Sequence, residues 1–96
     1  MKDLRGKTAI ISGGAEGIGF GVAQDMGRQG MNVVLADINV EQLQRAEKSL
    51  LEQGISVLTV ALDAADIGQW HNVAERTIER FGKVHMLVNN AGVGGT

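Results

Sequence analysis

Short apolar segments alternate with longer amphipathic segments, and this alternation restricts the possible folds more than any other feature. The apolar segments, each expected to be a strand, are residues 7–12, 31–36, 55–62 and 84–89. Segments that are apolar throughout are typical of parallel strands buried on both faces by connecting helices. The sequence therefore predicts an α/β fold, a doubly wound parallel sheet with helices on both faces.

The segments between the strands carry the signals of helices. Helices are expected over residues 17–29 and 40–53, and a third is expected to begin after Asp66 and to end at Gly82. Asp66 can accept hydrogen bonds from the first turn of that helix, with Gln69 as its partner in a capping box. Trp70, on the same helix, is predicted to pack between helix and sheet.

Right-handed crossovers in a doubly wound sheet predict four strands in the order 3-2-1-4. The fourth strand is then an open parallel edge, which is unusual for a complete sheet. We therefore expect residues 1–96 to form a single dinucleotide-binding domain, the N-terminal part of a larger one that is incomplete at the fourth-strand edge.

Composition and charge exclude several classes of partner and site. The net charge is −2 and the basic residues are scattered, so no nucleic-acid surface is expected. No apolar run has the length of a membrane span, and the first residues do not resemble a signal peptide. With no cysteine and two histidines, no metal site is expected. A cytoplasmic protein without a membrane partner is the expectation.

A glycine cluster, SGGAEGIG, separates the first strand from the first helix. Gly13, Gly17 and Gly19 have the spacing Gly-x-x-x-Gly-x-Gly. Glycine permits the tight turn and lets a phosphate approach the backbone, while the helix N-terminus offers free N–H groups and a positive dipole end. Gly19 would also let the helix pack closely on the sheet. The loop predicts the pyrophosphate site of a Rossmann-type fold, which Glu16 and Ile18 also line.

Asp37 ends the second strand, and Ile38 follows it. A carboxylate at this place can accept hydrogen bonds from both hydroxyls of the adenosine ribose, and it repels a 2′-phosphate. Glu16 adds a second carboxylate, and neither Lys nor Arg is close in the sequence. NAD(H) is therefore the predicted cofactor rather than NADP(H). A plain role for Asp37 in a turn or helix cap stays open.

Two further sets of residues follow the third and fourth strands. Asp63 and Ala64 would lie beside the adenine, and the Asp63 carboxylate can accept a hydrogen bond from the exocyclic amine of that base. A plain loop role for Asp63 is the alternative. Asn90, Ala91 and Gly92 follow the fourth strand, which lies beside the first at the switch point where cofactors bind. Small residues there would let a ribose approach.

Taken together, these motifs resemble the short-chain dehydrogenase/reductase family over essentially the whole chain. The glycine loop is similar to that family's Thr-Gly-x-x-x-Gly-x-Gly, with Ser12 in place of the Thr. Asp37, Asp63 and the Asn-Asn-Ala-Gly at residues 89–92 match its other motifs in order. The resemblance implies an NAD(H)-dependent oxidoreductase that transfers hydride between nicotinamide and an alcohol or carbonyl substrate, commonly as a dimer or tetramer.

The resemblance also implies catalytic residues that this chain does not contain. The family uses a Ser, a Tyr, a Lys four residues after the Tyr, and an Asn, and all are expected beyond Thr96 because the chain has no tyrosine. No catalytic residue is predicted within the chain, which would supply the dinucleotide-binding half and be inactive alone. His85 departs from the Asp that the family often has there.

Two alternatives stay open at this point. One is a nucleotide-binding module without catalysis, or a fragment of a split protein, which the missing tyrosine favours. The other is a methyltransferase that binds S-adenosylmethionine, although its glycine spacing is usually Gly-x-Gly-x-Gly. The substrate is not determined by these residues.

Overall fold

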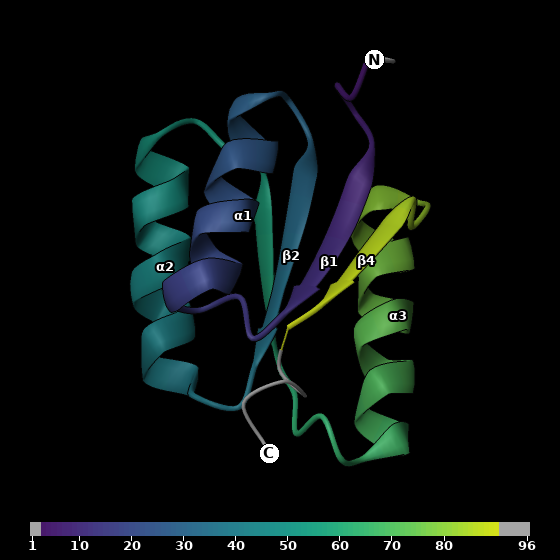
Figure 1. The fold of residues 1–96 in the computed structure, drawn as a ribbon. Coiled ribbons are helices and arrows are strands. Elements are labelled where there is room, and N and C mark those ends of the chain that lie inside the picture. Colours follow the sequence, from purple (N-terminus) through teal and green to yellow (C-terminus); the bar gives the residue numbers. More distant parts are fainter. Residues whose placement is uncertain (1–2, 91–96) are drawn as a thin grey trace.

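The computed structural model describes residues 3–90 and shows a parallel sheet of four strands in the order β3-β2-β1-β4 (Figure 1). The strands are β1 (Thr8–Ser12), β2 (Asn32–Asp37), β3 (Val57–Ala61) and β4 (Met86–Asn89). The helices are α1 (Gly17–Arg28), α2 (Val40–Glu52) and α3 (Ile67–Phe81). All three strand pairs are parallel, so the predicted fold class and strand order are confirmed.

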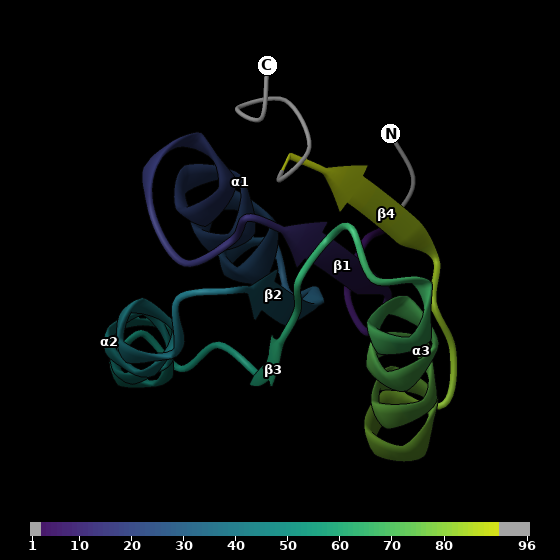
Figure 2. The ribbon, with the colours of Figure 1, turned by 90° about the horizontal axis from the view of Figure 1, so that it is seen from below.

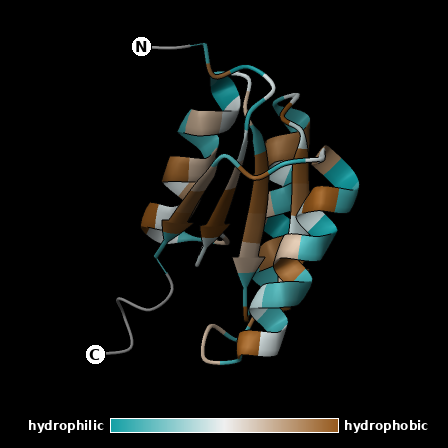
Figure 3. Cartoon of the chain, turned by 90° about the vertical axis from the view of Figure 1, so that its right-hand side faces the viewer, coloured by the Kyte–Doolittle hydropathy of each residue, from teal (hydrophilic) through white to brown (hydrophobic). Residues whose placement is uncertain are grey.

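The helices cover both faces of the sheet, with α1 and α2 on one face and α3 on the other (Figures 1 and 2). Successive side chains of a strand point to opposite faces. Ile11 and Leu35 accordingly pack in the core under α1 and α2, while Ile10 and Val34 pack in the core under α3. Figure 3 shows the hydrophobic strands enclosed between helices whose outer surfaces are more hydrophilic. Because the strands are parallel, the loops that follow them gather at one edge.

The ends of α3 confirm two of the predicted signals and correct a third. The Asp66 side chain accepts hydrogen bonds from the N–H groups of Gly68 and Gln69, and Gly82 ends the helix with a φ of 87°. Gln69 does not complete a capping box, because the N–H of Asp66 already donates to the Asp63 carbonyl at 2.9 Å. The Gln69 side chain instead accepts from the N–H of Asp63 at 2.7 Å.

The fourth strand differs from the other three in burial. It begins at Met86, later than the predicted range 84–89, and Met86 and Leu87 are 38% and 55% exposed. The prediction of burial on both faces is therefore wrong for β4. The cause is its position, since β4 is an edge strand and pairs with β1 alone among the described strands.

His85 joins β4 to β1 through its side chain as well as its backbone. Its Nδ1 accepts a hydrogen bond from the N–H of Thr8 at 3.0 Å, and its own N–H donates to the Thr8 carbonyl at 2.8 Å. The first bond requires a neutral ring with its hydrogen on Nε2. Thr8 is fully buried, so its N–H has no access to water as an alternative acceptor. The imidazole thus extends the β1–β4 pairing by one bond.

Replacing His85 should therefore destabilise the sheet, and the loss should be smaller when the new side chain can also accept the hydrogen bond from Thr8. We expect His85→Leu to lower the free energy of unfolding by about 1–3 kcal/mol, the cost of a buried donor left without a partner. His85→Asn offers an amide oxygen in its place and should lose less. Urea denaturation of both variants and the parent chain measures the difference. Equal losses in the two variants would show that the Nδ1 bond contributes nothing.

Candidate functional site

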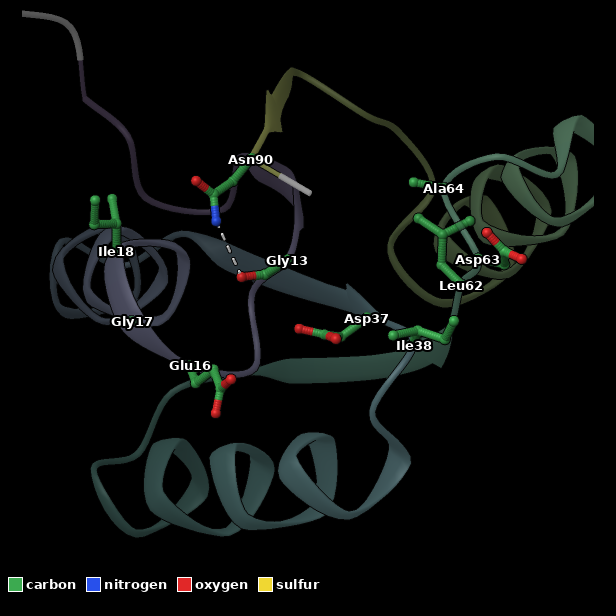
Figure 4. Close-up of a pocket in the computed structure, with 10 residues that line it drawn as sticks. All are labelled: Gly13, Glu16, Gly17, Ile18, Asp37, Ile38, Leu62, Asp63, Ala64 and Asn90. Atoms are coloured by element: carbon green, nitrogen blue, oxygen red, sulfur yellow. Dashed lines mark hydrogen bonds between the residues drawn. The ribbon is translucent and has the colours of Figure 1, made fainter. Parts of the chain in front are cut away.

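A cavity of about 590 Å³ lies at the carboxyl edge of the sheet, where the loops after β1, β2 and β3 meet the end of β4. Sites for small molecules are typically roughly 300–1,000 Å³. The residues that line it are Gly13, Glu16, Gly17, Ile18, Asp37, Ile38, Leu62, Asp63, Ala64 and Asn90 (Figure 4). The sequence predicted all of these as site residues except Leu62. Of the other predicted residues, Gly19 does not line the cavity, and Ala91 and Gly92 lie outside the described residues.

Leu62 was missed because its apolar side chain suggested only a core residue. It is 2% exposed, and its N–H donates to the Asp37 carbonyl at 2.9 Å. It follows β3 directly and precedes Asp63. Its place at the carboxyl end of a predicted strand was the signal that could have found it.

The glycine loop has the backbone that the motif predicts. Gly13 and Gly17 have φ values of 67° and 62°, a region that side chains rarely adopt. A Cβ added at Gly17 would meet no protein atom within 4 Å, although the residue lines the cavity. A side chain at Gly17 would therefore strain the backbone without any clash inside the protein. The space beside its backbone stays open to a ligand.

Gly19 is required by a contact different from the predicted one. A Cβ at this position would overlap the Gly13 carbonyl oxygen and lie 3.1 Å from Nδ2 of Asn90. Asn90 donates from Nδ2 to that same carbonyl at 3.3 Å (Figure 4). Gly19 thus allows the start of α1 to lie against the glycine loop, rather than against the sheet as predicted.

The first turn of α1 is open, in contrast to those of the other helices. Asn39 caps α2 by accepting from the N–H of Gln42, and Asp66 caps α3. The N-cap residue of α1, Glu16, makes no side-chain hydrogen bond to the helix. The N–H groups at the start of α1 therefore lie at the cavity without a capping side chain, and an anion is the group they suit.

Asp37 has the position predicted for it and also the turn role that the sequence left open. Its two carboxylate oxygens accept from the N–H groups of Ala15 at 3.2 Å and of Asn39 at 3.1 Å. A carboxylate has about four acceptor positions, so it retains capacity for a ligand. Asp37 therefore fastens the glycine loop to the end of β2 and faces the cavity as well.

The charge around the cavity is negative. Glu16, Asp37 and Asp63 line it, and none of the described residues that line it is Lys or Arg. A cation does lie in the vicinity, and the sequence did not reveal it. Gln42 donates to Glu16, and Arg45 donates to Oε1 of Gln42 at 2.8 Å. Both lie on α2 and line a neighbouring cavity of about 380 Å³, so Arg45 reaches Glu16 only through Gln42.

Ser12 holds the ends of β1 and β4 together beneath the cavity. Its Oγ donates to Oδ1 of Asn89 at 2.9 Å and accepts from the N–H of Asn90 at 2.9 Å. Ser12 is fully buried. Its hydroxyl therefore has a structural role, and it fixes Asn90 at the side of the cavity next to the glycine loop.

Comparison with known proteins decides the family. The model of the short chain dehydrogenase family matches residues 7–96. The chain belongs to this family. An uncharacterized oxidoreductase from Thermotoga maritima is 42% identical to this chain over 90 residues, which cover 94% of this chain and 35% of that protein. The chain thus spans about a third of the length of the curated relatives that it matches.

Solved structures of the family have the same fold but differ in cofactor. A short-chain dehydrogenase/reductase from Burkholderia phymatum in complex with NAD has a TM-score of 0.87 and 36% identity, covering 91% of this chain and 31% of that one. L-Sorbose reductase from Gluconobacter frateurii, complexed with NADPH and L-sorbose, has a TM-score of 0.89 and 38% identity, covering 96% and 36%. Membership of the family therefore leaves the choice between the two dinucleotides open.

Within residues 3–90, no group of three or more His, Cys, Asp or Glu side chains could hold a metal ion. None of the helices in the same range is long and apolar enough to cross a membrane.

The close contact between Gly19 and the Gly13 carbonyl can be tested by adding a methyl group at position 19 and, as a control, at position 21. We expect Gly19→Ala to weaken the binding of a reduced nicotinamide dinucleotide by about tenfold or more, or about 1.4 kcal/mol, because the Gly13 carbonyl must move. Gly21→Ala lies in the same helix, where an added Cβ meets nothing within 4 Å, and it should leave binding unchanged. Fluorescence titration with NADH measures both. If the two variants bind NADH equally well, the contact does not shape the site.

Proposed function

We propose that this chain binds NAD(H) and is the dinucleotide-binding part of an oxidoreductase that transfers hydride between nicotinamide and an alcohol or carbonyl substrate. One observation carries the proposal. The uncapped start of α1, the glycine loop and the carboxylate of Asp37 all face the same cavity. Residues 1–96 would form one domain-sized part of a larger catalytic domain.

The pyrophosphate would lie against the first turn of α1. Its charge suits the free N–H groups and the positive end of the helix dipole. Gly13 and Gly17 have positive φ values, and neither has a side chain to stand between backbone and phosphate. Ile18, which is 79% exposed, stands beside them at the mouth of the cavity. Together these residues suit a diphosphate in shape as well as in charge.

The adenosine ribose would lie over Asp37 and Ile38. The carboxylate of Asp37 can accept hydrogen bonds from the two ribose hydroxyls, and the same charge opposes a 2′-phosphate. Glu16, which also lines the cavity, adds to that repulsion, and Arg45 is engaged by Gln42. These features favour NAD(H) over NADP(H).

The two ends of the dinucleotide would then lie along opposite walls. Asp63 and Ala64 lie on the α3 side of the cavity, where the adenine would be placed (Figure 4). Asn90 lies on the opposite side, next to Gly13, where the ribose on the nicotinamide side would approach. Ala91 and Gly92 follow it in the chain and complete the proposed cofactor site.

The reaction itself would need residues outside these 96. The chain contains no tyrosine, the residue that the family resemblance implies as general acid/base. We therefore propose that the chain alone binds the cofactor without catalysis. The whole protein would act on its substrate in the cytoplasm as a homo-oligomer, a dimer or tetramer, with no nucleic-acid or membrane partner. A nucleotide-binding module without catalysis is the second candidate, and the same missing tyrosine favours it.

Calorimetric titration with NADH and NADPH tests the choice of cofactor. We expect NADH to bind at least about tenfold more tightly, a difference of about 1.4 kcal/mol. Asp37→Asn removes the charge but keeps an acceptor oxygen, and it should reduce that preference. Asp25→Asn removes an exposed charge on α1 that does not line the cavity, and it should leave the preference unchanged. Equal or tighter binding of NADPH by the parent chain would refute the assignment.

A further inference from the structure

The loop between β3 and α3 forms one wall of the cavity and is tightly folded on itself. The N–H of Ala65 donates to Oδ1 of Asp63 at 3.0 Å, and the N–H of Asp66 donates to the Asp63 carbonyl at 2.9 Å. Asp63 thus receives two bonds from the residues that follow it. In Figure 4 its carboxylate lies on the side of the loop towards α3, and not towards Asp37. The conformation of this loop therefore decides what Asp63 can reach.

Two side chains in the first turn of α3 hold this loop from outside the cavity. Oε1 of Gln69 accepts from the N–H of Asp63 at 2.7 Å, and Nε1 of Trp70 donates to the Ala64 carbonyl at 2.8 Å. Asp63 and Ala64 line the cavity, whereas Gln69 and Trp70 do not. Consecutive loop residues are therefore tied to consecutive helix residues.

Trp70 is itself well anchored. Its ring packs against the core cluster on the α3 face, which includes Leu62 and Val73. Asp66, the N-cap of α3, accepts a further bond from Nε2 of Gln69 at 3.3 Å. The helix, the two side chains and the loop thus form one connected unit. A phenylalanine at position 70 could fill much of the same space but could not donate to Ala64.

We propose that Trp70 and Gln69 are positioning residues for an adenine subsite formed by Asp63 and Ala64. The inference rests on the proposed function, because it requires a dinucleotide in the cavity. A carboxylate held at a fixed place on the rim accepts from the exocyclic amine of adenine. A purine with a carbonyl oxygen at that position would place one acceptor against another, which is unfavourable. The selectivity between the two bases is the property that Trp70 and Gln69 control.

The test compares NADH with reduced nicotinamide hypoxanthine dinucleotide, which carries a carbonyl in place of the amine. We expect the full chain to bind NADH about tenfold more tightly, in the range for a hydrogen bond to a charged group. Asp63→Asn keeps the turn and supplies a donor, and it should abolish or invert the preference. Trp70→Phe and Gln69→Ala should each reduce the preference to about threefold or less, since the carboxylate loses its fixed position.

Val73→Ala is the matched control for stability. Val73 is fully buried on the same helix and in the same core cluster as Trp70, but it makes no hydrogen bond to the loop. It should lower the melting temperature and leave the preference for NADH intact. Gln69 is only partly buried, so Gln69→Ala keeps the test valid even where Trp70→Phe folds poorly.

The outcomes separate this inference from the proposed function. Failure of the parent chain to bind either dinucleotide would overturn the proposed function, and the inference with it. Binding with a preference that Asp63→Asn removes, but that Trp70→Phe and Gln69→Ala leave unchanged, would overturn the positioning role alone. A preference that Asp63→Asn does not alter would overturn the adenine subsite. If Val73→Ala also lost the preference for NADH over the hypoxanthine dinucleotide, Trp70 would act through packing alone, and its positioning role would be overturned.

Discussion

The close approach of the Gly13 carbonyl to the start of α1 is the contact on which the site depends. It is possible only because Gly19 has no Cβ, and Asn90 at the end of β4 donates to the same carbonyl. The start of α1 and the end of β4, which lies 77 positions further along the chain than Gly13, therefore meet at one backbone oxygen. Ser12 adds two more hydrogen bonds between the ends of β1 and β4, so this side of the cavity consists of closely packed and hydrogen-bonded atoms.

Two of the loops around the cavity are held by hydrogen bonds with different side chains. Asp37 ties the glycine loop to the end of β2 through Ala15. Gln69 and Trp70 tie the loop after β3 to α3. Polar side chains thus hold the backbone of two loops that line the cavity in place. A preorganised site of this kind loses less entropy when it binds.

The N-termini of the three described helices differ in whether a side chain caps them. Asn39 and Asp66 satisfy the first turns of α2 and α3. Glu16 leaves the first turn of α1 open and places its carboxylate near Gln42 on the neighbouring helix. The one described helix without a capping side chain is the one that begins at the glycine loop. The open first turn of α1 and the carboxylate of Asp37 line the same cavity, and the proposed dinucleotide would place its pyrophosphate at the first and its ribose at the second.

The sequence by itself determined the order of elements, the parallel sheet and most of the cavity lining. Those properties depend on local patterns: apolar runs, helix-capping residues, and glycines at positions of positive φ. Nine of the predicted site residues line one cavity, because parallel strands bring their carboxyl ends to one edge. Gly19 was predicted and does not line it, whereas Leu62 lines it and was not predicted, since burial and lining look alike in a sequence.

Only the tertiary structure decided which residues form hydrogen bonds when the partners lie far apart in the chain or when two acceptors compete for one donor. His85, directly before β4, accepts from Thr8, which is 77 positions away in the chain. The side-chain oxygen of Gln69 accepts from the N–H of Asp63 rather than from that of Asp66, which already donates to the Asp63 carbonyl. Arg45 approaches the site through the packing of α2 beside α1. Residue type limits what a side chain can bond, but three-dimensional packing determines which partner is within reach.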